Sequence, residues 1–322
     1  MQRNSIVKRI FNTKEMGVII PTLAFVIVVS IINPVFLSAD NLINVLRASS
    51  FTLITALGMT LVLVSGGLDL SVGSVLAVGS IICGLALTAG IPIPVAFAIG
   101  VLAGLALGTI NGMIIIKFKI PPLIMTLGML YMGRGIVHII TQGTPIYPLP
   151  KEFQAIEQDI TLGLPNVVYI ALVLSVVFHF ILTNTVFGRK IYAIGGNKEA
   201  ARLSGINISM THLAIYAIAG ALAAFTGVIQ ASRLGSAQPN AGSGYELTVI
   251  AATIIGGTST YGGVGTILGT IIGSLFMNIL TNSMMLMKVS AYWQNLVIGA
   301  ILVLAVIIDQ LNRDRKLKAV NK

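Results

Sequence analysis

The sequence predicts an all-α integral membrane protein with about ten transmembrane helices and cytoplasmic N- and C-termini. Of its 322 residues, 56% are hydrophobic and only 9% are charged, whereas soluble globular domains carry about 25% charged residues. The mean hydropathy is +0.95, and the apolar residues form runs long enough to cross a bilayer as helices. This composition excludes an ordinary soluble protein and favours a chain whose solvent is lipid.

Ten apolar runs follow one another along the chain, separated by turn-forming or charged residues. The clearest break is the segment 117–122, where two consecutive prolines cannot continue a helix. The expected spans cover approximately residues 17–32, 42–64, 72–87, 94–116, 123–140, 166–182, 211–230, 245–255, 264–282 and 293–308. The eighth span is short for a bilayer unless it extends into residues 256–263.

The distribution of Lys and Arg orients these spans. Ten spans place both termini on one side of the membrane, together with the loops near residues 117, 195 and 260, and fifteen of the 20 Lys and Arg residues fall on that side. The other five are Arg47, Arg134, Lys151, Arg233 and Lys288. Basic residues concentrate on the cytoplasmic side of membrane proteins, so we expect the termini in the cytoplasm. The basic residues lie in clusters between the apolar runs and not on one continuous face. The net charge of +10 is therefore not that of a nucleic-acid-binding surface.

The expected organisation is a single transmembrane domain over residues 1–322. Residues 1–16 and 310–322 would be cytoplasmic tails, and residues 184–210 a cytoplasmic loop. The basic N-terminal tail precedes an apolar run, as in a signal peptide, but no small-residue cleavage site follows, so we expect the first span to be retained. The longest polar loop, residues 141–165, would lie on the opposite side.

Residues that could support catalysis are scarce. Cys83 is the only cysteine, so no intramolecular disulfide can form, and we expect it to be a small buried hydrophobic residue. The three histidines form no His-x-x-x-His pair, which argues against a metal site. No Gly-x-x-x-x-Gly-Lys-Ser/Thr loop is present for binding ATP in the manner of P-loop proteins. We therefore expect no enzyme activity, no bound cofactor and no metal.

A polar island at residues 195–208 interrupts the apolar pattern and has the parts of a short helix. Asn197 is a suitable N-cap after two flexible glycines, Glu199 places negative charge in the first turn, and Gly205 can end the helix in a left-handed conformation. A small apolar face would be made of Ala200, Ala201 and Leu203. A solvated loop would explain only the basic residues of this island, whereas a short amphipathic helix suits docking into a groove on a soluble partner.

Asp69 lies between two closely spaced apolar runs. A charge at membrane depth is costly and usually marks function, so Asp69 could belong to a pathway through the membrane or to its gate. Alternatively, it caps the third span and accepts a hydrogen bond from the amide of Ser71 or Val72. Because the second span ends before Gly66, we expect Asp69 near the cytoplasmic face.

Small polar residues in the later spans also have two interpretations. They either line a wet path or join helices by hydrogen bonds, which is the more common role. These residues are Gln230, Asn278, Thr281 and Asn282. The candidates for a gate or pathway are Gly66, Gly67, Asp69, Ser71, Asn278 and Asn282.

Arg134 and a set of regularly spaced glycines complete the features within the spans. Arg134 lies toward the outer half of the fifth span, where its side chain can extend to the outer interface, in the opposite leaflet from Asp69. Gly100, Gly104 and Gly108 recur at the spacing that lets two helices approach closely.

Three stretches resemble the ribose-type permeases for simple sugars, which are subunits of ABC importers. These stretches are Gly66-Gly-Leu-Asp-Leu-Ser-Val-Gly73, Phe187-Gly-Arg-Lys-Ile-Tyr-Ala-Ile-Gly-Gly-Asn197, and Ser236-Ala-Gln-Pro-Asn-Ala-Gly-Ser-Gly-Tyr-Glu-Leu247 continuing to Gly256-Gly-Thr-Ser259. The pattern Glu199-Ala200-Ala201-x-x-x-Gly205, followed by Ile215, resembles the Glu-Ala-Ala loop of importer permeases. It lacks the usual Leu-Pro ending, which argues against the maltose-like branch. The resemblance extends from about residue 17 to residue 309.

The resemblance implies a multi-pass permease in the bacterial cytoplasmic (inner) membrane that dimerises with a second copy or a homologue to form the sugar path. A cytoplasmic ABC ATPase, often two ATPase domains in one chain, would bind ATP and Mg²⁺, and a periplasmic or lipid-anchored binding protein would deliver the sugar. The helix that couples to the ATPase would comprise Asn197, Glu199, Ala200, Ala201, Arg202, Leu203 and Gly205. Candidates for facing the binding protein are Arg233, Gln238, Asn240 and Glu246.

The expected function is import of a monosaccharide such as ribose, xylose or galactose by alternating access. ATP binding would close the ATPase, move the helix around Glu199 and open the path toward the docked binding protein, and hydrolysis would reset it. Permeases for branched-chain amino acids or nucleosides of the same superfamily are the main alternative. An ion-coupled secondary transporter is another, with Asp69 as the available membrane carboxylate. The sequence does not name the sugar, because specificity resides mainly in the binding protein.

Overall fold

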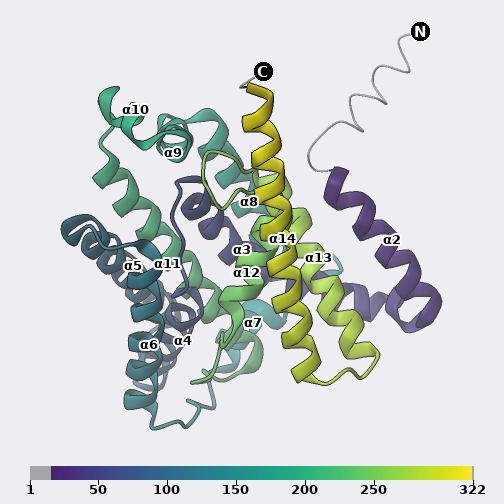
Figure 1. Cartoon of the computed structure of the whole chain (residues 1–322). Helices are drawn as coiled ribbons and strands as arrows, with labels where there is room; N and C mark the ends of the chain where they lie inside the picture. The colour runs from purple at the N-terminus through teal and green to yellow at the C-terminus, as the bar shows by residue number, and fades with distance from the viewer. Residues whose placement is uncertain (1–15, 321–322) are drawn as a thin grey trace.

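The computed structural model describes residues 16–320, and within them it confirms an all-α membrane protein (Figure 1). Seven of the described helices are long and apolar enough to cross a membrane. They are α3 (Ala39–Val64), α5 (Ile93–Phe118), α6 (Pro122–Thr141), α8 (Asn166–Asn184), α11 (Ile208–Leu234), α13 (Ile267–Leu286) and α14 (Ala291–Val320). The shorter apolar helices are α2 (Met16–Ile32), α4 (Val72–Thr88) and α12 (Tyr245–Ile255).

Each predicted span coincides with one of these helices, usually with ends that differ by a few residues. The exception is α14, which continues to Val320, because the charges after residue 308 end the apolar run without breaking the helix. The predicted C-terminal tail is therefore helical over residues 310–320. The predicted N-terminal tail, up to residue 15, and residues 321–322 lie outside the described residues. The ten-span count and the cytoplasmic termini stay predictions.

The polar loops at residues 141–165 and 184–210 contain short elements that the sequence did not predict. The first holds α7 (Lys151–Gln158) and a two-stranded antiparallel hairpin of β1 (Ile160–Thr161) and β2 (Leu164–Pro165). The second holds α9 (Val186–Gly196), whose N-cap Thr185 accepts a hydrogen bond from the Gly188 amide, before α10 (Lys198–Leu203). A short 3₁₀ helix, η1 (Pro34–Leu37), joins α2 to α3. These elements are too short for hydrophobic periodicity to reveal.

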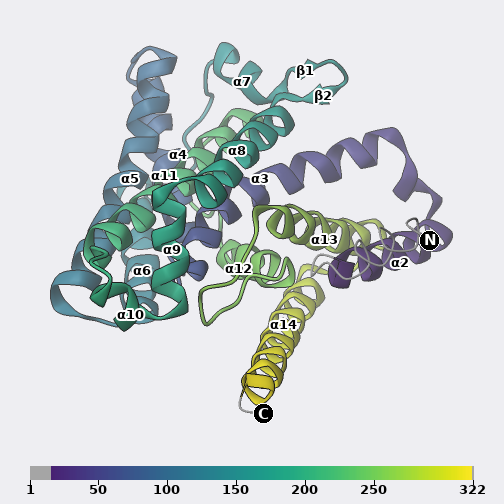
Figure 2. The same cartoon turned by 90° about the horizontal axis from the view of Figure 1, so that it is seen from above.

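Helix α3 lies at the centre of the bundle. It packs against α8, α11, α12 and α13, and α11 in turn packs against α4 and α5. Seen from above, α4, α5 and α6 lie on one side of α3, and α2 and α14 lie on the other (Figure 2). Within its most apolar segment, 83% of the α3 residues are buried, against none for α14. We conclude that α3 is surrounded by protein, whereas α14 presents its apolar side chains outward.

The glycines of α5 permit its close contact with α11, as their spacing predicts. A Cβ at Gly104 would collide with the carbonyl oxygen of Gly220, and one at Gly108 would collide with that of Tyr216. Two helices whose backbones approach this closely gain van der Waals contacts, which hold helices together in a membrane. The small-residue spacing therefore has a packing role.

The two ends of the bundle differ in the elements they carry. Helices α9 and α10, the beginning of α2 and the C-terminal end of α14 lie at the top of Figure 1, whereas the α13–α14 connection lies at the bottom. This grouping matches the sides expected from the basic residues. The orientation of those sides relative to the cytoplasm remains a prediction.

Candidate functional site

Helix α10 has the end structures that the polar island predicts. The Asn197 side chain accepts a hydrogen bond from the Ala200 amide at 3.0 Å and so caps the helix. Gly205 has φ +79°, and its amide donates to the Arg202 carbonyl, while the Ile206 amide donates to that of Ala201. This pair of bonds around a left-handed glycine is a Schellman-type ending.

The three residues predicted to form one apolar face of α10 do not share a face. Ala201 is buried, but Ala200 is exposed and Leu203 is 83% exposed. Ala201 and Leu203 are two residues apart, about 200° around a helix, and so point in opposite directions. Glu199 and Arg202 form an ion pair of 3.0 Å that is largely solvated and adds little stability. Leu203 is therefore an apolar side chain on an otherwise polar, outward-facing helix.

Gly195 and Gly196 are the last residues of α9 rather than a flexible linker, which corrects the interpretation from sequence. A Cβ at Gly195 would collide with the Val64 carbonyl oxygen and the Gly263 amide nitrogen. A Cβ at Gly262 would lie 2.9 Å from the Gly195 Cα and 3.0 Å from that of Gly66. The Gly263 amide also donates to the Val64 carbonyl at 2.8 Å. We call the meeting of Val64, Gly66, Gly195, Gly262 and Gly263 the glycine junction.

Asp69 lies just after the glycine junction and is buried, with 1% of its surface exposed. One carboxylate oxygen accepts from the Ser71 amide at 2.8 Å and from the Ser71 hydroxyl at 2.6 Å. The Ser71 hydroxyl accepts in turn from the Asn111 side chain at 2.9 Å. The bond to the Ser71 amide matches the capping alternative, although Ser71 itself occupies the N-cap position of α4. These contacts are those of a group that shapes the turn between α3 and α4.

The polar residues of α13 join it to α3. Asn278 donates to the Thr52 hydroxyl at 2.9 Å, and Asn282 and Asn41 exchange two hydrogen bonds of 2.8 and 3.1 Å. Thr281 donates to carbonyls of its own helix. These bonds are the interhelical type that the sequence left open beside a wet path. A pathway role for Asn278 and Asn282 stays a prediction.

The Arg134 side chain binds the loop before α12, a contact that the sequence did not predict. Its guanidinium donates to the Ala241 carbonyl at 2.6 Å and to that of Pro239 at 3.4 Å. A half-buried guanidinium needs acceptors, and this loop supplies two carbonyls. Of the residues predicted to face a binding protein, Asn240 is exposed here, and Glu246 lies half-buried in the first turn of α12.

The other two of those residues are Gln238, in this loop, and Arg233, near the end of α11, and both are half-buried. The Gln238 side chain donates to the Ser236 hydroxyl at 2.9 Å. The Arg233 guanidinium lies 5.8 Å from the centre of the Phe51 ring, within the range of a cation–π contact. A contact of Gln238 and Arg233 with a binding protein stays a prediction.

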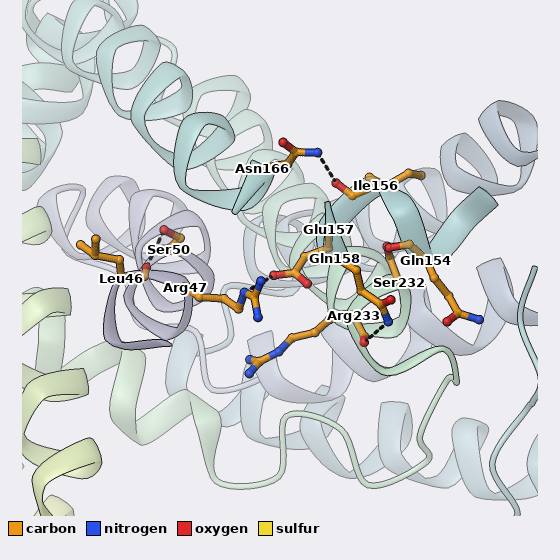
Figure 3. Close-up of polar contacts among 10 residues, drawn as sticks. All are labelled: Leu46, Arg47, Ser50, Gln154, Ile156, Glu157, Gln158, Asn166, Ser232 and Arg233. Carbon is orange, nitrogen blue, oxygen red and sulfur yellow. Dashed lines mark hydrogen bonds and ion pairs between the residues drawn. The ribbon is translucent and has the colours of Figure 1, made fainter. Parts of the chain in front are cut away.

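A charged cluster that the sequence did not reveal joins α3, α7 and α11 (Figure 3). Glu157 of α7 is fully buried and forms a 3.0 Å ion pair with Arg47 of α3. Arg233, at the end of α11, lies close enough for its positive charge to act on the same carboxylate, although its guanidinium forms no ion pair with it. Burial raises the pKa of Glu157, and the positive charges of Arg47 and Arg233 oppose that rise. The one sequence signal was the spacing of Phe153 and Glu157, which places both on the same face of a helix.

Other chemistry-bearing residues form no comparable cluster in the described part of the chain. Cys83 is buried in the core, as expected. No group of three or more His, Cys, Asp and Glu residues that could hold a metal ion occurs within residues 16–320. The candidate functional features are therefore α10, the glycine junction beside it, and the charged cluster with its neighbouring loop at the other end.

Comparison with known proteins places the chain among permeases. A family model described as "Branched-chain amino acid transport system / permease component" matches residues 41–306. The ribose import permease protein of Haemophilus influenzae is 39% identical over 307 residues, covering 94% of this chain and 95% of that protein. The ribose import permease protein of Bacillus subtilis is 42% identical, covering 92% and 93%. The D-allose transport system permease protein of Escherichia coli is 36% identical, covering 86% and 85%. No solved structure matches this chain.

Proposed function

Because this chain belongs to the branched-chain amino acid/ribose permease superfamily, we propose that it is the membrane-spanning subunit of an ATP-driven, binding-protein-dependent importer of a monosaccharide. The names of its relatives mention ribose and D-allose, which supports a five- or six-carbon sugar as substrate. The chain is a multi-pass membrane protein, and we place it in the bacterial inner membrane. A second copy or a homologue completes the path.

The observation that carries the proposal is α10, a capped helix that projects from one end of an apolar bundle. Its outward face presents Glu199, Arg202 and Leu203, and it is fixed at both ends by Asn197 and Gly205. A short rigid helix with one exposed apolar side chain fits a groove on a soluble protein. We assign that groove to a cytoplasmic ABC ATPase, whose two ATPase domains bind ATP and Mg²⁺.

The opposite end of the bundle fits a sugar-delivering partner. It carries α7 and the loop with Arg233, Gln238 and Asn240, two of which are half-buried and one exposed. A periplasmic or lipid-anchored binding protein docks on this face in the proposed cycle. ATP binding then moves α10 and opens the path outward, and hydrolysis restores the inward state. The ATPase shifts the equilibrium between the inward and outward states by binding one of them more tightly than the other.

The assignment of α10 is tested in proteoliposomes containing the permease, its ATPase and its binding protein. We expect Glu199→Lys to abolish co-purification of the ATPase and ATP-dependent uptake, because it replaces the exposed carboxylate in the first turn with a cation. Gly205→Pro should do the same, because proline cannot adopt φ +79°. Glu152→Lys, at an exposed carboxylate in the first turn of α7, is the control for co-purification of the ATPase, because α7 lies at the opposite end of the bundle from α10. Uptake and ATPase stimulation that survive Glu199→Lys and Gly205→Pro would contradict the proposal.

The substrate is tested through the partner binding protein. We expect its melting temperature to rise with D-ribose or another monosaccharide, because a ligand that binds only the folded state stabilises it. Leucine and adenosine serve as the competing ligands, since branched-chain amino acids and nucleosides are the alternative cargoes. A shift with either of these and with no sugar would replace the monosaccharide assignment while leaving the ABC permease assignment intact.

A further inference from the structure

The glycine junction lies between the coupling helix and the centre of the bundle, and the proposed function does not account for it. Gly195 is the second-last residue of α9 and lies two residues before Asn197, the N-cap of α10. Its Cα faces the backbone of α3 at Val64 and the loop 256–263 at Gly263, so closely that a Cβ would collide with both. Three segments far apart in the sequence therefore touch backbone to backbone at one point.

Contacts of this kind transmit displacement with little loss. Side chains can change rotamer when a neighbour moves, but two backbones without an intervening side chain must move together or separate. A hydrogen bond of 2.8 Å from the Gly263 amide to the Val64 carbonyl adds a directional link. Gly262 and Gly263 have φ of +87° and +73°, so the loop keeps a conformation that other residues adopt only with strain.

The loop 256–263 is also fixed to α14. One oxygen of Asp309 accepts from the Thr260 amide at 2.9 Å, the Thr260 hydroxyl at 3.0 Å and the Ser259 hydroxyl at 3.1 Å. The Arg313 guanidinium lies 4.0 Å from the centre of the Tyr261 ring, a favourable cation–π distance. The loop is therefore held in place by α14, and Gly195 packs against it.

The other partner of Gly195 leads directly to the α3–α4 turn. Val64 is the last residue of α3, and Gly66 and Asp69 follow within five residues. Asp69 and Ser71 tie this turn to α4 and, through Asn111, to α5. A displacement of Val64 consequently reaches the start of α4 and the buried polar group beside it.

We propose that the glycine junction transmits the movement of α10 to α3 and α4, with Gly195 and Gly262 as positioning residues of the transport cycle. This inference rests on the proposed function, because it requires an ATPase that moves α10. It adds a specific route, from Gly195 across a backbone contact to Val64, and it identifies the loop 256–263 as the support. No side chain of the junction needs to contact the sugar.

The test uses the reconstituted complex with D-ribose as the probe and compares Gly195→Ala with Gly196→Ala. The first Cβ collides with two backbones, whereas the second meets nothing within 4 Å at the same helix end. We expect Gly195→Ala to retain the ATPase, because the surface of α10 is unchanged, and to lower the D-ribose transported per ATP hydrolysed by about tenfold. Gly196→Ala should remain close to the unmodified chain. Equal ratios for both variants would overturn the proposal.

Hydrogen exchange separates failure of this inference from failure of the proposed function. In the unmodified complex, ATP should change amide exchange both at residues 197–203 and at residues 64–71. In Gly195→Ala, we expect the first change to persist and the second to be lost. Persistence of both changes would overturn the route, even if another sugar proves to be the cargo. Absence of ATP-dependent D-ribose uptake in the unmodified complex would instead count against D-ribose as the cargo and leave the route through the glycine junction unaffected.

Asp309→Ala provides a variant that adds no bulk, in case Gly195→Ala does not assemble. It removes the acceptor that fixes the loop 256–263 and leaves every glycine in place. We expect a lower transport-to-ATP ratio than in the unmodified complex, with partial recovery in Asp309→Asn, which keeps one side-chain oxygen. Unchanged ratios in an assembled Asp309→Ala complex would overturn the supporting role of the loop and with it the proposal.

Discussion

Asp69 has the hydrogen-bond partners of a residue that holds a turn in shape. Its carboxylate accepts from the Ser71 amide and hydroxyl while almost entirely buried. Asparagine keeps an oxygen that can accept the same bonds, whereas alanine leaves two buried donors without a partner, at a cost of about 1–3 kcal/mol. We predict that Asp69→Asn retains most of the uptake and that Asp69→Ala lowers the melting temperature and uptake together. Thermal unfolding in detergent and transport in proteoliposomes measure the two effects.

The same pair of variants also tests the alternative role of Asp69. If its charge were used to couple an ion or to bind the cargo, Asp69→Asn would abolish uptake while the melting temperature stayed near that of the unmodified chain. That result would contradict the structural role and favour the pathway interpretation. Ser71→Ala tests the same turn without changing the carboxylate, since it removes one of the two donors to Asp69 and the acceptor for Asn111.

Single residues were predictable from sequence where their partners are local. Asn197 and Gly205 end a helix through bonds to residues within four positions, and the sequence pattern contains both partners. The partners of Arg134 could not be predicted, because its acceptors at Pro239 and Ala241 lie more than 100 residues away. Glu157 was missed for the same reason, since nothing near it in sequence indicates Arg47.

At the scale of helices, the contact between α5 and α11 depends on the absence of side chains. We predict that Gly108→Ala destabilises the protein by about 1–3 kcal/mol, the usual cost of forcing extra atoms into a packed interface. Its Cβ would meet the Tyr216 carbonyl and the Gly220 Cα, the latter at 3.1 Å. Thermal unfolding in detergent micelles is the measurement.

Gly128→Ala is the control for this prediction, because an added Cβ there meets nothing within 4 Å in the midst of α6. It should leave stability unchanged or raise it by up to about 1 kcal/mol, the helix propensity of alanine over glycine. Equal melting temperatures for Gly108→Ala and Gly128→Ala would show that α5 and α11 can separate without loss.

Helices were predictable from sequence where crossing the bilayer requires a long apolar run. Runs of apolar residues mark α5 and α8 clearly, because a bilayer requires about 20 such residues in a helix. The short helices α7 and α9 lie in polar segments, where no such requirement applies. The polar bonds between α3 and α13 could be anticipated as a class from Asn278 and Asn282, but their partners on α3 come from the packing.

At the scale of the molecule, α3 is held at two distant points. Near its beginning, Arg47 pairs with Glu157 of α7, and at its end Val64 accepts from Gly263 in the glycine junction. The helix is 26 residues long, about 39 Å at 1.5 Å per residue. It therefore connects the end of the molecule that carries α10 with the end that carries α7. In the proposed cycle, a movement that begins at Gly195 would reach the charged cluster along α3.

In the charged cluster, the negative charge of Glu157 faces Arg47 and also acts on Arg233. Glu157→Gln removes it and leaves the half-buried Arg47 guanidinium without its counter-ion. We therefore predict a loss of stability of up to about 3 kcal/mol, below the usual cost of breaking a fully buried pair. Replacing both partners, in Arg47→Met with Glu157→Leu, should cost less than the sum of the two changes made singly, because it removes both charges of the ion pair and leaves only Arg233 without its counter-ion. Glu152→Gln, exposed on the same helix, is the control. Additive losses would show that Arg47 and Glu157 act independently and that α7 is held on α3 by other contacts.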